Sequence, residues 1–354
     1  MGVGIQIANG KAFEYACVIA LHEQLSGWQT IVIEDSSQME TARKLYNEIS
    51  EDMKPLLDAA ARAAVRIIKK LEPQLIEANG NEPLQLSLQA DAAGIKGDVR
   101  DVLCIRKPNG WEIGLSCKHN HHAVKHSRLS DTIDFGQEWL GVPCSKEYFD
   151  KVVPLFAKLR EIRDKSKLDG RPALWSDVAG KAEKYYIPVL RAFMEELSKI
   201  NSENENIPEK LIRYLLGRYD FYKVITDDKN KTTRVEAVNI AGTLNQQSGK
   251  VKPITKIPML KMPTQFYHMG FKLGSDNTIE VVCDEGWQIS MRIHSASSRI
   301  EPSLKFDVNL ISLPSSVYTQ MEPWENDPDN DRRIRLGEYA EKIYLSQKHR
   351  GENC

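Results

Sequence analysis

The sequence lacks long apolar runs and any strong excess of charge of one sign. The apolar stretch at residues 12–21 is interrupted by Glu14 and is too short to cross a bilayer, so we expect neither a spanning segment nor a signal peptide. The formal net charge of −1 excludes a uniformly basic nucleic-acid binder. Any surface for a polyanion must therefore be local.

Cysteine is also scarce and irregularly placed. There is no CxxC pair and no regular spacing among the six cysteines, which are Cys17, Cys104, Cys117, Cys144, Cys283 and Cys354. This pattern excludes a disulfide framework and predicts reduced, mostly buried thiols in a cytoplasmic protein. A 354-residue chain that is 41% apolar is long enough for one large domain or two ordinary ones.

Residues 97–118, GDVRDVLCIRKPNGWEIGLSCK, predict a β-hairpin around which the chain is organised. Its turn at residues 107–110 contains Pro, Asn and Gly, which suit a hairpin connection. If Arg106 lies opposite Trp111, then Asp101 lies opposite Ser116, and residues directly opposite each other share a face. Alternation along the second strand adds Lys118 to the same face.

An acid and a lysine on one hairpin face are the pattern of a PD-(D/E)xK nuclease core. The carboxylate holds a divalent metal, and the lysine orients or deprotonates the attacking water and meets developing charge. The pattern is short, and an exposed hairpin with an incidental charge pair is the alternative.

The set of metal ligands in this pattern is incomplete, because Ser116 occupies the position of the second acid. Asp98 has the wrong strand parity unless a bulge intervenes. Glu112 has the right parity but lies about 13 Å along the strand from Ser116. Glu14, on the apolar face of a helix predicted over residues 11–25, is a third candidate ligand; the alternative is that its stem packs while its head reaches solvent.

The remaining patterns predict an α/β chain with a mixed sheet flanked by helices. Strands are expected at residues 29–35 and 84–91, with helices between them. We expect four regions: a nuclease core at 1–145, a helical insertion at 146–249, an antiparallel β-rich recognition region at 250–320, and a charged, loosely helical or disordered tail at 321–354.

A basic, histidine-rich segment follows the hairpin. Between residues 96 and 130, seven Lys or Arg face three acids, and histidines stand at 119, 121, 122 and 126. This composition suits phosphate contacts, for which we single out Lys125, His126 and Arg128. A zinc site is disfavoured because no regularly spaced ligand pairs occur. A scaffold or metal-storage role for the histidines is a separate alternative.

Residues 286–305 concentrate hydrogen-bond donors in one strand-loop-strand unit. Arginine is the favoured reader of guanine, so this unit is the candidate for base recognition. A polar surface loop is the alternative. The candidate residues are Gln288, Arg292, His294, Ser297, Arg299 and Lys305.

Four stretches of the chain resemble the HaeIII family of type II restriction endonucleases. They are GKAFEYACVIAL at 10–21, GDVRDVLCIR at 97–106, WEIGLSCKHNHHAVKHSRLS at 111–130 and GWQISMRIHSASSRIEPSLKFDV at 286–308. The resemblance extends from about residue 10 to about residue 313 and has the four stretches in the family's order.

The resemblance implies a PD-(D/E)xK fold and Mg²⁺-dependent double-strand cleavage of DNA at GGCC between G and C, leaving blunt ends. It also implies a cognate DNA methyltransferase as functional partner. Carried over residue by residue, Asp101 and Lys118 are the hairpin acid and lysine, Glu14 is the helix glutamate, and Asp98 and Glu112 are alternates for the missing ligand.

Two questions stay open at the level of sequence. A DNA-binding protein without catalysis, in which Ser116 marks a decayed metal site, is the alternative to a nuclease. A palindromic site favours a twofold dimer, but a chain of this length can also carry two half-site readers in one monomer.

Overall fold

The chain groups into two compact units, each assembled from separate stretches of sequence. A computed structural model describes residues 3–77, 82–90, 97–120, 123–168, 170–249 and 251–324. Unit 1 comprises residues 1–122, 219–260 and 316–354, and unit 2 comprises residues 123–218 and 261–315. The two units do not follow the four sequence regions, because strands that are distant in sequence pair with one another.

Unit 1 contains a mixed seven-stranded sheet in the order β1-β2-β3-β4-β6-β7-β12. The β1/β2 and β4/β6 pairs are parallel, and the others are antiparallel. The strands are β1 (Ile31–Ile33), β2 (Leu84–Leu88), β3 (Val102–Arg106), β4 (Trp111–His119), β6 (Phe221–Asp227), β7 (Thr232–Val238) and β12 (Thr319–Pro323). Unit 1 is thus an α/β unit with a mixed sheet, as the sequence predicts.

The central hairpin has the predicted register. Arg106 pairs with Trp111 across the β3–β4 turn, and Leu103 pairs with Gly114. The turn is the short 3₁₀ segment η1 (Lys107–Asn109), followed by Gly110 at φ 65°. The backbone at residue 110 is in the left-handed region, which glycine adopts without strain. Gly110 therefore suits the last position of the turn.

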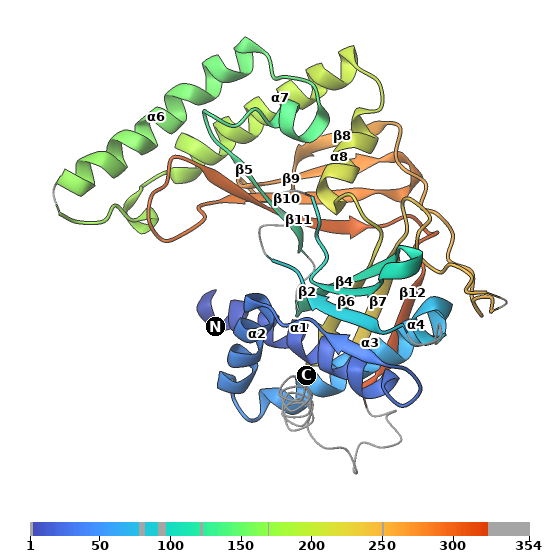
Figure 1. Cartoon of the computed structure of the whole chain (residues 1–354). Helices are drawn as coiled ribbons and strands as arrows, with labels where there is room; N and C mark the ends of the chain where they lie inside the picture. Colours follow the sequence, from blue (N-terminus) through green and yellow to red (C-terminus); the bar gives the residue numbers. More distant parts are fainter. Residues whose placement is uncertain are drawn as a thin grey trace. The chain divides into compact units, whose positions relative to one another are not determined.

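Helices cover one face of this sheet (Figure 1). They are α1 (Val3–Leu25), α2 (Ser37–Glu48), α3 (Met53–Leu71) and the short α4 (Pro73–Ile76). Helix α1 begins eight residues before the predicted start at residue 11. Fully buried alanines, Ala16 and Ala20 on α1 and Ala60 and Ala64 on α3, suit the close packing of these two helices.

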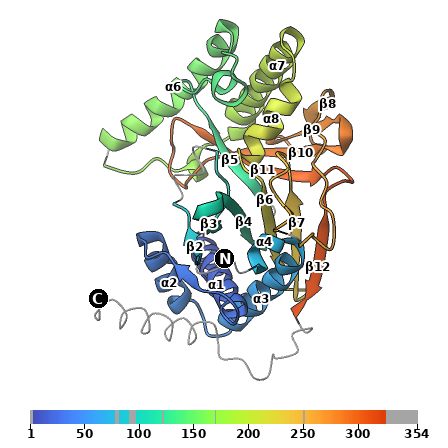
Figure 2. The same ribbon diagram turned by 45° about the vertical axis from the view of Figure 1, so that its right-hand side comes forward.

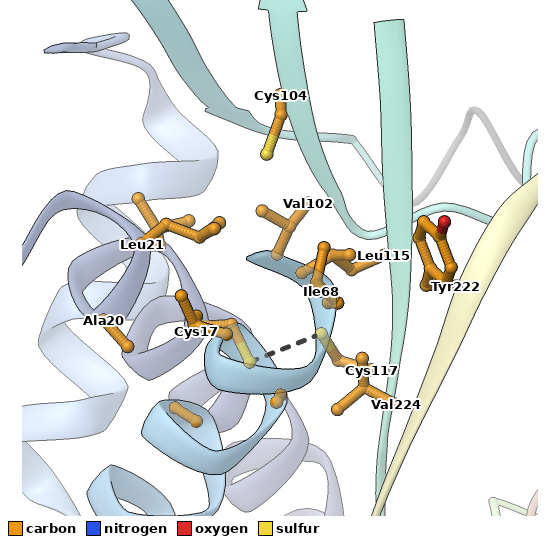
Figure 3. Packing of buried hydrophobic residues seen from close by; sticks show 14 of the residues in the cluster. Cys17, Ala20, Leu21, Ile68, Val102, Cys104, Leu115, Cys117, Tyr222 and Val224 are labelled. Carbon is orange, nitrogen blue, oxygen red and sulfur yellow. Dashed lines mark hydrogen bonds between the residues drawn. The ribbon is translucent and has the colours of Figure 1, made fainter. Parts of the chain in front are cut away.

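The core of unit 1 lies between these helices and the sheet. Cys17 of α1 and Cys117 of β4 meet in it with their sulfur atoms 3.8 Å apart, beside Leu115 and Val224 (Figure 3). Because side chains alternate along β4, the inward-facing Cys117 turns its neighbours Ser116 and Lys118 to the opposite face of the sheet.

Unit 2 is a five-stranded antiparallel sheet, ordered β5-β11-β10-β9-β8, with helices packed on one face (Figure 2). Its strands are β5 (Ala123–Leu129), β8 (Phe266–Phe271), β9 (Thr278–Cys283), β10 (Gln288–His294) and β11 (Leu304–Ser312). Its principal helices are α6 (Lys146–Leu168), α7 (Ile187–Glu203) and α8 (Ile207–Leu216). The ring of Phe193 on α7 lies 5.4 Å from that of Phe306 on β11.

The shorter turns of unit 2 are η2 (Gly136–Leu140), η3 (Trp175–Asp177), η4 (Ala182–Tyr186) and η5 (Asp284–Gly286). In the described residues, no helix is both long and apolar enough to span a membrane. Strand β12 occupies the start of the region expected as a tail, and the expectation for residues 325–354 lies outside the described residues.

Candidate active site

The hairpin acid and lysine meet as the sequence predicts. Asp101 immediately precedes β3, and its Oδ2 accepts a 2.7 Å hydrogen bond from the backbone N–H of Cys117. The Nζ of Lys118 lies 3.4 Å from the same oxygen. The Asp101 and Lys118 side chains are only 22% and 15% exposed, so both are held in a fixed, partly dehydrated arrangement.

Glu14, from the middle of α1, belongs to the same electrostatic cluster. Its side chain is 9% exposed, and its Oε2 lies 3.0 Å from Nζ of Lys11. Burial, reinforced by the nearby Asp101 carboxylate, raises the pKa of Glu14 to about 7, while Lys11 and Lys118 act in the opposite direction. Two carboxylates that repel each other in a partly buried place are a donor set that suits a hard divalent cation.

A lysine that the sequence interpretation missed lies on the same sheet face. Lys223 of β6 lies opposite Ser116 in the parallel β4/β6 pair. On its other side, Lys223 lies opposite Glu236 of β7. Lys223 is only 3% exposed, and burial lowers its pKa to about 8. The available signal was a lone lysine inside the otherwise apolar run FYKVIT.

The two alternate acids, Asp98 and Glu112, are both bound by Arg100. Asp98 lies 2.7 Å and Glu112 2.5 Å from the guanidinium nitrogens. Arg100 crosses Gly114 so closely that a Cβ at residue 114 would stand 2.2 Å from Cδ of Arg100. Its guanidinium also stacks on the Tyr219 ring, 4.1 Å from the centroid. Arg100 thus links the two ends of the hairpin, and its ion pairs with Asp98 and Glu112 leave both acids poorly placed to bind a metal ion.

The site therefore brings two acids together rather than three. No group of three or more His, Cys, Asp or Glu that could hold a metal ion occurs among the described residues. Glu14 and Asp101 fit a divalent cation that takes its other ligands from water or a phosphate, as Mg²⁺ commonly does.

The histidine segment is only partly described. His119 Nε2 lies 2.9 Å from Asp228 Oδ2, which also accepts a 2.7 Å hydrogen bond from the Asn120 amide. These contacts tie the end of β4 to the β6–β7 turn. His121 and His122 lie outside the described residues.

The predicted recognition residues of unit 2 share one face of its sheet. Arg292 on β10 pairs with Asp307 on β11, and His294 pairs with Lys305, which in turn pairs with Arg128 on β5. Cross-strand partners lie on the same face. The opposite face carries the buried Ile293 and Phe306, so the polar face is the one that the helices leave uncovered.

The other predicted recognition residues lie near this face. Gln288 precedes Arg292 by four residues on β10 and therefore has the same parity. Ser297 and Arg299 are exposed in the β10–β11 loop, where the Ser297 hydroxyl accepts a hydrogen bond from the Arg299 N–H. Lys125 and His126 stand on β5, but their side chains lie outside the described residues.

Comparisons with known proteins agree on one family. A sequence profile of the HaeIII restriction endonuclease matches residues 10–314. The chain is 42% identical over 318 residues to the type II restriction enzyme HaeIII of Haemophilus aegyptius, an alignment that covers 90% of this chain and 98% of the relative. No solved structure matches significantly.

Proposed function

The chain belongs to the HaeIII family and is a type II restriction endonuclease, a site-specific deoxyribonuclease; from this premise we propose that it cuts duplex DNA at GGCC between G and C. We propose further that the chemistry takes place on the PD-(D/E)xK-like hairpin of unit 1. The observation that carries the proposal is the contact of Asp101 with Lys118 and with the Cys117 N–H, with Glu14 of α1 in electrostatic reach of Asp101 and Lys118.

Each of the three residues has a distinct task in this proposal. Asp101 and Glu14 would hold Mg²⁺, which when bound would supply an activated water and neutralise charge on the scissile phosphate. Lys118, held by Asp101, donates a hydrogen bond that positions the attacking water for in-line displacement. The Cys117 N–H fixes the Asp101 carboxylate, so that the acid and lysine are already oriented before DNA arrives.

The polar face of the unit 2 sheet supplies the recognition surface in this proposal. GGCC contains only G·C pairs, and arginine pairs best with the O6 and N7 atoms of guanine. Arg292 is 56% exposed and Arg128 46% exposed, which supports their access to DNA. Lys125, His126 and Lys305 would contact phosphates, while Gln288, His294, Ser297 and Arg299 complete the surface.

The oligomeric state, the partner protein and the cellular location of the enzyme are part of the proposal. A palindromic site favours a homodimer whose twofold axis matches that of the DNA. A cell that contains GGCC sites needs a cognate methyltransferase to protect them. The free cysteines among the described residues agree with a reducing compartment, and we place the enzyme in the cytoplasm.

Plasmid digestion with end mapping tests the proposed function. Wild-type protein and Lys118→Ala are incubated with a plasmid of known sequence in Mg²⁺ and in EDTA. We expect discrete blunt fragments that end in GG and CC for the wild type in Mg²⁺ alone, and a rate about 10²- to 10³-fold lower for Lys118→Ala.

Lys44→Ala is the matched control, since Lys44 is 72% exposed and pairs with Glu48 one turn along its own helix. Cleavage by Lys118→Ala at the wild-type rate would refute the site. An intact plasmid under every condition would refute the nuclease and favour the binding-only alternative, with Ser116 as its signature.

A further inference from the structure

An acid, Asp307, lies at the centre of the basic face of unit 2. Its Oδ2 accepts a 2.6 Å hydrogen bond from Nη2 of Arg292, the residue directly opposite it on β10. The Nε2 of His294, two residues along β10, lies 3.1 Å from the same oxygen. One carboxylate oxygen therefore holds Arg292 by a hydrogen bond and lies close to the His294 ring, whose Nε2 makes no hydrogen bond within the described part of the chain.

The ion pair between Arg292 and Asp307 contributes little to the stability of the fold. Arg292 is 56% exposed, and an ion pair with one solvated partner contributes only about 0 to 1 kcal/mol to stability. A carboxylate on a phosphate-binding surface also repels DNA. Its place among Arg292, His294, Lys305 and Arg128 therefore calls for a role other than stability or general affinity.

The geometry of the pair suits orientation of the guanidinium. A guanidinium carries five N–H donors, and the contact with Asp307 engages one nitrogen at the end of the fork. This contact restrains the orientation of the guanidinium while its other donors can meet an external acceptor. A bidentate contact to O6 and N7 of guanine gains from such a restraint.

We propose that Asp307 is a positioning residue for sequence recognition, which holds Arg292 in the orientation that reads a guanine of the target site. The inference rests on the proposed function, because it presumes that this face meets DNA. Asp307 has no part in the cleavage chemistry proposed for the hairpin of unit 1. Its removal should therefore alter discrimination between sequences more than affinity for DNA in general.

The test compares Asp307→Asn, Asp307→Glu and Glu195→Gln with wild type. Glu195 pairs with Lys151 at 2.7 Å on the helices of unit 2 and is the matched control. Dissociation constants are measured in EDTA for a GGCC duplex and for a duplex in which the site is permuted to CGCG. Cleavage rates in Mg²⁺ are measured on GGCC and on sites with one altered base pair.

We expect Asp307→Asn to lower the preference for GGCC by about tenfold or more, because a misoriented arginine loses the bidentate contact. Binding to the permuted duplex should stay the same or tighten, since a negative charge is lost. Asp307→Glu should recover part of the preference, and Glu195→Gln should keep all of it. In an Arg292→Ala background, Asp307→Asn should have no further effect on the preference for GGCC.

Three outcomes would overturn a part of the account. An unchanged preference in Asp307→Asn, with a wild type that discriminates, refutes the positioning role alone. Equal weakening on both duplexes together with a lower melting temperature assigns Asp307 to the fold and also refutes it. A wild-type protein that shows no preference refutes the proposed function instead.

Discussion

Each of the two sheets carries a charged face, but their arginine–carboxylate pairs differ in solvent exposure. In unit 1, Arg100 is 4% exposed and its partner Asp98 13% exposed. In unit 2, Arg292 is 56% exposed and Asp307 18% exposed. The first pair is buried in the fold, whereas in the second pair the Arg292 side chain is exposed and can meet a ligand. The same two residue types thus serve architecture in one sheet and, in our proposal, recognition in the other.

Removal of Arg100 should give the largest loss of stability. Arg100→Met keeps much of the side-chain volume over Gly114 but leaves Asp98 and Glu112 without their shared cation. Breaking a buried pair costs about 3 to 5 kcal/mol, and the partial exposure of Glu112 places our expectation near 3 kcal/mol. Urea unfolding of the variant and the wild type measures it. A loss below about 1 kcal/mol would show that the pair is not structural.

A smaller effect should come from the buried Glu72 in the core of unit 1. Glu72 Oε1 accepts hydrogen bonds from the Tyr222 hydroxyl at 2.6 Å and from the Asn245 N–H at 2.7 Å. Burial nevertheless raises its pKa from 4.5 to about 7. Because the pKa of Glu72 is higher in the folded state than in the unfolded state, its full contribution to stability is present only below the unfolded pKa. The free energy of unfolding then falls as the pH rises from about 4.5 toward 7.

Between pH 5 and pH 8, ionisation of Glu72 should therefore cost the wild type on the order of 2 kcal/mol. Glu72→Gln should flatten this part of the profile, because Gln does not titrate. Glu48→Gln, at a residue whose side chain is 57% exposed, is the control and should keep the wild-type slope. Free energies of unfolding measured at several pH values decide the matter. Parallel profiles for wild type and Glu72→Gln would contradict the assignment.

The smallest change in stability should follow Arg292→Met. Because its guanidinium is largely solvated, we expect a change within about 0.5 kcal/mol. The same substitution at residues 100 and 292, measured by the same urea titration, directly compares the two faces. Similar losses at both residues would remove the contrast between a structural and a recognition pair.

Local patterns in the sequence were enough to predict the hairpin and the proximity of Asp101 to Lys118. The Pro-Asn-Gly turn fixed the pairing of Arg106 with Trp111, which the structure confirms. Asp101 and Lys118 follow from that register by alternation. Glu14 could be placed only as a helix residue on an apolar face, yet the structure brings it within electrostatic reach of Asp101.

Features that depend on distant pairing could not be predicted. Strand β12 pairs with β7 across about eighty residues of sequence, and no local signal marks Thr319–Pro323 as a strand. The capture of Asp98 by Arg100 depends on the space above Gly114, which exists only in the folded sheet. Asp307 could not be singled out from a pattern of DNA-binding donors, because it is an acid.

The most direct test of the division between the two sheets is a paired measurement on Lys118→Ala and Arg292→Ala. Binding to GGCC and permuted duplexes is measured in EDTA, and single-turnover cleavage is measured in Mg²⁺. The account predicts that Lys118→Ala keeps the wild-type binding preference but loses cleavage, whereas Arg292→Ala loses the preference and cleaves GGCC slowly because it binds the site poorly. Loss of preference in Lys118→Ala, or full preference in Arg292→Ala, would contradict it.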